Sequence, residues 1–127
     1  MNRATKQRDA IRSCLERAAR PLSPQEILNE ASPEVPGLGL ATVYRTLRML
    51  TEEGFITAVE LPGEPARYEL ASVAHSHHHH FHCETCDRVF DVEGCPSGIQ
   101  QLLPRGFTLR RHEITLHGMC KQCAKAS

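Results

Sequence analysis

The sequence lacks a long uninterrupted apolar run and an excess of charge of either sign. Its first 16 residues alternate charged and apolar side chains, so we expect neither a signal peptide nor a membrane-spanning helix. The 15 lysine and arginine residues balance 15 acidic residues, so net charge alone gives no argument for a nucleic-acid partner. We expect the chain in the cytoplasm, where thiols stay reduced and available for metal.

The length of 127 residues permits one compact domain or two small ones. A unit of roughly 55 to 70 residues buries a small fraction of its surface and often depends on a metal or a partner chain. We therefore expect a homodimer.

Four of the six cysteines form two Cys-x-x-Cys pairs, Cys83/Cys86 and Cys120/Cys123. Each pair allows two thiolates to bind one ion from a tight turn, and two pairs complete a tetrahedral zinc shell without an open position. This pattern predicts a structural zinc site. Cys14 and Cys95 remain unassigned. Cys95 could extend the metal site, but we interpret it as a half-buried bystander thiol.

A run of histidines lies directly before Cys83 and comprises His77, His78, His79, His80 and His82. Imidazoles at alternate strand positions face the same way, which predicts a second, more exchangeable metal site. A tag-like repeat is the alternative, but the run is internal and adjoins the first cysteine pair. His112 and His117 lie in a strand-like stretch, FTLRRHEITLH, where a lone histidine is often a surface residue.

The first half predicts three helices followed by two strands. Ser23 to Glu26 combine an N-cap, a proline at the first helical position and a capping-box acid, and this second helix is expected to end near Ala31. Strands are expected at residues 55–60 and 66–70, on either side of a Pro- and Gly-containing turn. This order predicts a winged helix-turn-helix.

The expected third helix, LATVYRTLRMLTEEG, has two different faces. Its apolar stripe consists of Val43, Leu47 and Leu50, and Gly54 ends it. Polar side chains on the opposite face suit a recognition helix in the major groove. The first 20 residues add six basic side chains against two acidic ones, which suits phosphate contact.

The strings GLATVYRTLRML, YEL, HHHHFHCETC and HGMCKQC occur in the order found in the ferric uptake regulator family of metal-dependent bacterial repressors. The chain resembles this family from about residue 3 to 123. The resemblance implies an α+β protein with a winged-helix DNA-binding domain at residues 1–71 and a hinge at 72–74. Residues 75–127 would form a small α/β dimerisation domain with the four-cysteine zinc site.

The resemblance also implies the site residues. The structural zinc falls on Cys83, Cys86, Cys120 and Cys123, and the regulatory metal, Fe²⁺, Mn²⁺ or Zn²⁺, on Glu69, His78, His80 and Asp91. A further metal site would draw on His75, His77, His79 and His112. The residues themselves place the DNA contacts on the polar face of the third helix, opposite its apolar stripe, and on the basic first helix: Lys6, Arg8, Thr42, Tyr44, Arg45 and Arg48.

Two family ligands have no counterpart at the matching positions. The helix-two histidine of some members aligns near Pro21, and the acid that completes the further site falls near Gln100. His75 or a water is expected to substitute for the missing histidine.

The resemblance implies a homodimeric repressor that reads a palindromic operator in double-stranded DNA and controls metal homeostasis. Iron, manganese or peroxide sensing is favoured, because residues 65–82 contain no cysteine of the kind that zinc-dedicated members use. A zinc-uptake regulator is the alternative. A zinc-ribbon interaction module would not need the TVYR helix, and a zinc hydrolase would need a base-bearing motif such as HExxH, which the chain lacks, so we expect no enzyme.

Overall fold

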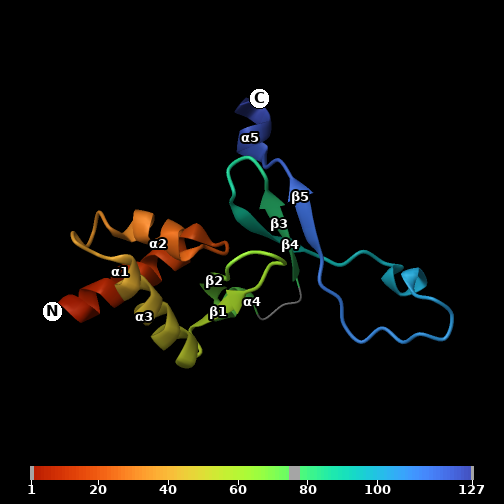
Figure 1. Ribbon diagram of the computed structural model, residues 1–127, viewed down its shortest axis with the longest axis horizontal. Coiled ribbons are helices and arrows are strands. Elements are labelled where there is room, and N and C mark those ends of the chain that lie inside the picture. The colour runs from red at the N-terminus through yellow and green to blue at the C-terminus, as the bar shows by residue number, and fades with distance from the viewer. Residues whose placement is uncertain (1, 75–77, 127) are drawn as a thin grey trace. The chain divides into compact units, whose positions relative to one another are not determined.

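The computed structural model describes residues 2–74 and 78–126, with the backbone alone described at residues 74 and 78. The chain divides into two compact units, residues 1–76 and 77–127. Each unit combines helices and strands (Figure 1), which confirms the predicted α+β class. The residues expected to form the hinge belong to a short helix, α4 (Ala71–Ala74).

Three helices form the body of the first unit: α1 (Arg3–Ala18), α2 (Pro24–Ala31) and α3 (Leu40–Glu52). The predicted capping box at α2 is present. The Glu26 amide donates to Ser23 Oγ at 3.1 Å, and the Ser23 amide donates to Glu26 Oε1 at 3.0 Å. Both bonds satisfy amides that the helix itself leaves without acceptors, so the chain turns into α2 at this point.

The core of this unit lies between the three helices. The predicted stripe of α3 is completely buried there. It packs with apolar side chains of the other elements, which include Ala10, Ile11, Leu15, Leu22, Ile27, Ala31 and Ile56. The exposed side of α3 is therefore held in place by its buried side.

Two strands, β1 (Ile56–Val59) and β2 (Arg67–Leu70), pair antiparallel and form the predicted wing. Leu22, just before α2, exchanges two backbone hydrogen bonds of 2.8 Å with Tyr68 of β2. The buried Arg67 guanidinium also donates to Glu26 Oε1 at 3.2 Å. The wing is thus attached to the start of α2.

The second unit is a three-stranded sheet with a C-terminal helix. Its strands are β3 (His78–Cys83), β4 (Val89–Glu93) and β5 (Thr115–Gly118), and the helix is α5 (Lys121–Ala126). The strand order is β4-β3-β5, with β4 antiparallel and β5 parallel to the central β3. The part of the histidine run that the structure describes, from His78 onward, therefore lies on the central strand of the sheet.

The connection from β4 to β5 projects from the sheet and contains one short 3₁₀ helix, η1 (Ile99–Leu102) (Figure 1). Our strand-like interpretation of residues 107–117 was wrong for most of that stretch, because β5 begins only at Thr115. The Ile114 amide donates to the His79 ring, the Ile114 carbonyl accepts from the His80 amide at 3.1 Å, and His112 lies outside the strand. Among the described residues, no helix is long and apolar enough to cross a membrane.

Replacing Ser23 by Ala should lower the free energy of unfolding of the first unit by about 1 kcal/mol, because the cap to the Glu26 amide is lost. Chemical denaturation followed by far-ultraviolet circular dichroism measures the change. Ser97→Ala, at an exposed position of the other unit, is the control. Equal midpoints for the two variants would contradict this role of the cap.

Candidate functional site

The four paired cysteines meet at one end of the sheet. Cys83 ends β3, Cys86 follows in the turn, Cys120 precedes α5 and Cys123 lies within that helix. Their sulfur atoms all lie within 4.8 Å of one another, and those of Cys86 and Cys120 are 3.8 Å apart. A tetrahedral zinc ion with Zn–S bonds of about 2.3 Å separates its sulfurs by roughly 3.8 Å. The cluster therefore fits a closed zinc site.

Backbone hydrogen bonds prepare this cluster for a cation. The Cys86 amide (3.4 Å) and the Cys120 amide (3.3 Å) donate to the Cys83 sulfur and lower the pKa of this thiol to about 6, against the opposing effect of burial. Removal from solvent raises the pKa of Cys123 to about 12. Four thiolates side by side repel one another, so they are stable together only around a cation.

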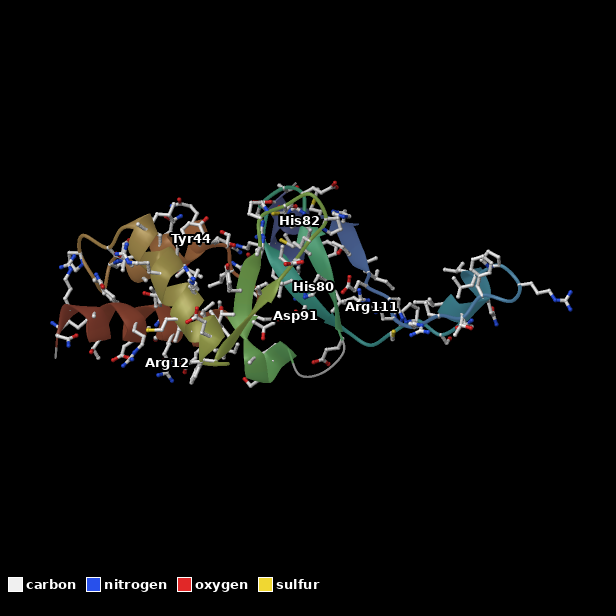
Figure 2. All side chains as sticks on the ribbon, turned by 60° about the horizontal axis from the view of Figure 1, so that its bottom comes forward. Arg12, Tyr44, His80, His82, Asp91 and Arg111 are labelled. Carbon is white, nitrogen blue, oxygen red and sulfur yellow. The ribbon has the colours of Figure 1, made fainter. Side chains whose placement is uncertain are left out.

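A second pair of potential ligands spans β3 and β4. His80 and Asp91 lie directly opposite each other, with Nε2 and Oδ1 3.2 Å apart and both side chains largely buried (Figure 2). The backbone of His78 lies opposite Glu93, and its side chain lies outside the described residues. Glu69 lies on β2 in the first unit, opposite Thr57.

A third cluster includes a residue that our sequence analysis did not assign to any site. His79 and His112 lie beside Cys95, and their three donor atoms lie within 4.8 Å of one another. Gln100 is not part of this cluster, since its amide donates to the Phe107 carbonyl. Two other expected ligands, His75 and His77, lie outside the described residues. The signal in the sequence was the thiol itself, a metal-binding group in the connection that leads to His112, although we interpreted Cys95 as a bystander.

The outer face of α3 is exposed and polar. Tyr44 is half exposed (Figure 2), and Arg45 Nη2 donates to Thr42 Oγ1 at 3.0 Å. Arg48 pairs with Glu52 at 3.4 Å in an exposed ion pair, which is worth little in water and can be exchanged for another anion. On α1, Lys6 is exposed and Arg8 is half-buried. This face can therefore offer cations and hydrogen-bond donors to a polyanion.

One basic side chain of α1, Arg12, contacts an aromatic ring of its own unit. The Arg12 guanidinium lies over the Phe55 ring, 4.0 Å from its centroid, and so covers an exposed aromatic side chain at the start of the wing (Figure 2). Burial raises the pKa of the Cys14 thiol, inside α1, to about 11. Cys14 is thus a packing residue of the first unit.

Comparison with known proteins gives one consistent result. The model of the ferric uptake regulator family matches residues 2–125. A ferric uptake regulation protein of Bacillus subtilis is 33% identical over 124 residues, which cover 94% of this chain and 83% of that protein.

Solved structures of proteins from this family superpose on the chain. The Helicobacter pylori ferric uptake regulator, described as having three functional metal binding sites, superposes with a TM-score of 0.65 at 29% identity. That match covers 94% of this chain and 80% of the other. A zinc-bound manganese uptake regulator gives a TM-score of 0.73 at 25% identity, over 91% of this chain and 88% of the other.

Replacing Cys83 by Ser should unfold the second unit, because it removes the thiol that accepts from two backbone amides and binds the ion. A structural zinc can contribute on the order of 10 kcal/mol, as much as a typical domain's whole stability. Metal analysis and proteolysis measure the effect, with Cys14→Ala as the control that removes a cysteine outside the cluster. A folded Cys83→Ser protein without zinc would refute the assignment.

Proposed function

The chain belongs to the ferric uptake regulator family, and we propose on that basis that it is a homodimeric transcriptional repressor whose DNA binding depends on a regulatory divalent metal. Two features of the same chain support this proposal. The face of α3 that points away from the core is polar and exposed, and His80 and Asp91 lie together in a pair suited to an exchangeable ion. A zinc-ribbon interaction module would require neither feature.

The DNA contact is proposed for the outer face of α3. An arginine can bind two acceptors of a guanine, and the Tyr44 ring can contact thymine methyl groups. The buried stripe keeps this face in a constant orientation, and the wing closes one side of the helix bundle. Lys6 and Arg8 would contact phosphates, so their contribution would not depend on base sequence.

The regulatory metal is proposed to bind His78, His80 and Asp91, with Glu69 of the winged unit as a further ligand. What supports this is the chemistry of the donors: a neutral imidazole and a carboxylate, opposite each other on adjacent strands, suit Fe²⁺, Mn²⁺ and Zn²⁺.

A metal that joins ligands of both units would act by selecting one angle between them. In a dimer, that angle sets the distance between two recognition helices, which must match half-sites one helical turn of DNA apart. The metal shifts the population toward this arrangement, and the shift cannot exceed its difference in affinity for the two states. The expected operator is therefore a palindrome.

The donor atoms of the proposed regulatory site bear on which metal it binds. We favour Fe²⁺ or Mn²⁺ at the His80–Asp91 pair because its donors are nitrogen and oxygen. A zinc-uptake regulator is the alternative, and the sulfur of Cys95 beside two histidines favours it. Anaerobic titration of the singly zinc-loaded protein with each metal, followed by operator binding, distinguishes them. Activation by zinc alone would establish the alternative.

Tyr44→Ala or Arg45→Ala should each weaken specific DNA binding by about 1 to 3 kcal/mol, because each removes a side chain from the face that would read bases. Binding is measured by fluorescence anisotropy with an operator selected from random DNA by the wild-type protein. Lys6→Ala is the comparison and should mainly reduce the salt dependence. Wild-type affinity in both α3 variants would mean that another element reads the DNA.

His80→Ala or Asp91→Ala should leave one tightly held zinc per chain and an unchanged melting temperature, but should abolish metal-dependent operator binding except at high metal. The reason is that these donors lie apart from the four thiols. His117→Ala, at an exposed position on β5, is the matched control. If His80→Ala and His117→Ala respond identically to added metal, the regulatory site lies elsewhere.

A further inference from the structure

A buried network of ion pairs joins the wing to the start of α2. The Arg67 guanidinium, on a side chain that is 4% exposed, donates to Glu26 Oε1 at 3.2 Å and to Glu64 Oε1 at 3.5 Å. The other oxygen of Glu26 accepts from Arg20 Nη2 at 3.0 Å. A charge withdrawn from water is stable only when its partners are well placed, so the buried Arg67 restricts where Glu26 can lie.

Glu26 is the residue at which these bonds meet. Its Oε1 atom also accepts from the Ser23 amide, so one carboxylate both caps α2 and binds two arginines. Beside it, Leu22 and Tyr68 exchange two backbone hydrogen bonds, each 2.8 Å long. Hydrogen bonds depend on direction as well as distance, so β2 is held in one position against the start of α2.

The strand held in this way also carries Glu69, the proposed regulatory ligand of the first unit. Arg67 and Glu69 are both buried, and Tyr68 between them is half-buried. This alternation places the Arg67 and Glu69 side chains on the same face of β2. A force on the Glu69 carboxylate therefore acts on the strand two residues away from its link to α2.

α2 in turn supports the exposed face of α3. Ile27 and Ala31 of α2 are completely buried, in the same core as the apolar stripe of α3. Protein interiors are closely packed, so a displacement of one helix is passed to its neighbour and is not absorbed by empty space. Contacts thus continue from Glu69 through β2 and α2 to the helix that carries the proposed DNA-binding face.

We propose that Glu26 and Arg67 are positioning residues, which transmit the binding of metal at Glu69 to the helices that carry the DNA-binding face. Because Glu69 is a ligand only in the proposed repressor, this role rests on the proposed function. Bound metal selects one position of Glu69, and the Arg67–Glu26 link converts it into one position of α2 relative to the wing. Without the link, metal still binds but no longer favours the arrangement that fits the operator.

Glu26→Gln separates the ion pairs from the helix cap. A glutamine at the third helical position accepts from the N-cap amide as a glutamate does, so α2 keeps its capping box and loses both ion pairs. Arg67→Met removes the guanidinium and keeps a long side chain. The double variant carries neither charge, so it lacks a buried guanidinium that has lost a carboxylate. Glu34→Gln, which breaks the exposed ion pair with Arg17, is the matched control.

The first measurement is the metal response, defined as the ratio of operator affinities with and without added metal. Full-length protein with one zinc per chain is titrated with operator DNA, without further metal, with Mn²⁺ and, separately, with Zn²⁺. Glu34→Gln should respond as wild type does. Glu26→Gln, Arg67→Met and the double variant should respond at least about ten-fold less. In chemical denaturation, the double variant should regain the stability that Glu26→Gln loses.

Three outcomes contradict these expectations in different ways. A full metal response in Glu26→Gln and Arg67→Met would overturn the positioning role and leave the proposed repressor intact. If the double variant regains the metal response together with its stability, the ion pair is a structural contact and the positioning role is wrong. Absence of a response in wild type to either metal would overturn the proposed function and this role with it.

Amide hydrogen exchange, without regulatory metal or DNA, gives an independent measurement. The Leu22 and Tyr68 amides should exchange about ten-fold faster in the double variant than in wild type, because the ion pair that holds their two segments together is lost. The restored global stability of this variant means that faster exchange reports local opening. Glu34→Gln should exchange as wild type does. Wild-type exchange of both amides in the double variant would show that the ion pair does not hold β2 to α2, and would overturn the proposal.

Discussion

The second unit depends on the four-thiol cluster, because it has almost no apolar core of its own. Among its described residues, the fully or nearly fully buried apolar side chains are Cys83, Val89 and Cys120, whereas the continuous core cluster lies in the first unit. A unit this small cannot offset its conformational entropy by burial alone. Zinc supplies the missing stabilisation by joining the end of β3 to α5.

The same cluster determines where the other centres can form. Cys83 ends the central strand, so fixing it also fixes the direction of β3 and the register of its histidines against β4 and β5. Strand alternation then divides these histidines between two faces, with His80 opposite Asp91 and His79 beside Cys95. One strand thus presents imidazoles on both faces of the sheet, one beside a carboxylate and one beside a thiol.

The first unit is stabilised in a different way. Its helices share a core of closely packed aliphatic side chains, and the buried Arg67–Glu26 ion pair joins the wing to the cap of α2. Removing a metal ligand from the second unit leaves these contacts intact. The exposed face of α3 thus depends on contacts within the first unit.

Local features of the fold could be predicted from the sequence because their physical causes are local. The capping box needs only Ser23 and Glu26 three positions apart, the α3 stripe needs only helical periodicity, and each cysteine pair meets within a single turn. That the two cysteine pairs come together could also be predicted, because a structural zinc ion takes four ligands and each pair supplies only two.

Tertiary structure decided what depends on where distant segments meet. Cys95 lies far from His79 along the chain, and it approaches that ring because β4 returns beside β3. His112 falls outside β5, whose pairing with β3 begins at Thr115 opposite His80. The residues themselves determined which donor atoms the chain offers. The pairing of β3 with β4 and β5 determined which of the distant ones lie close together, because residues far apart along the chain meet only when the sheet forms.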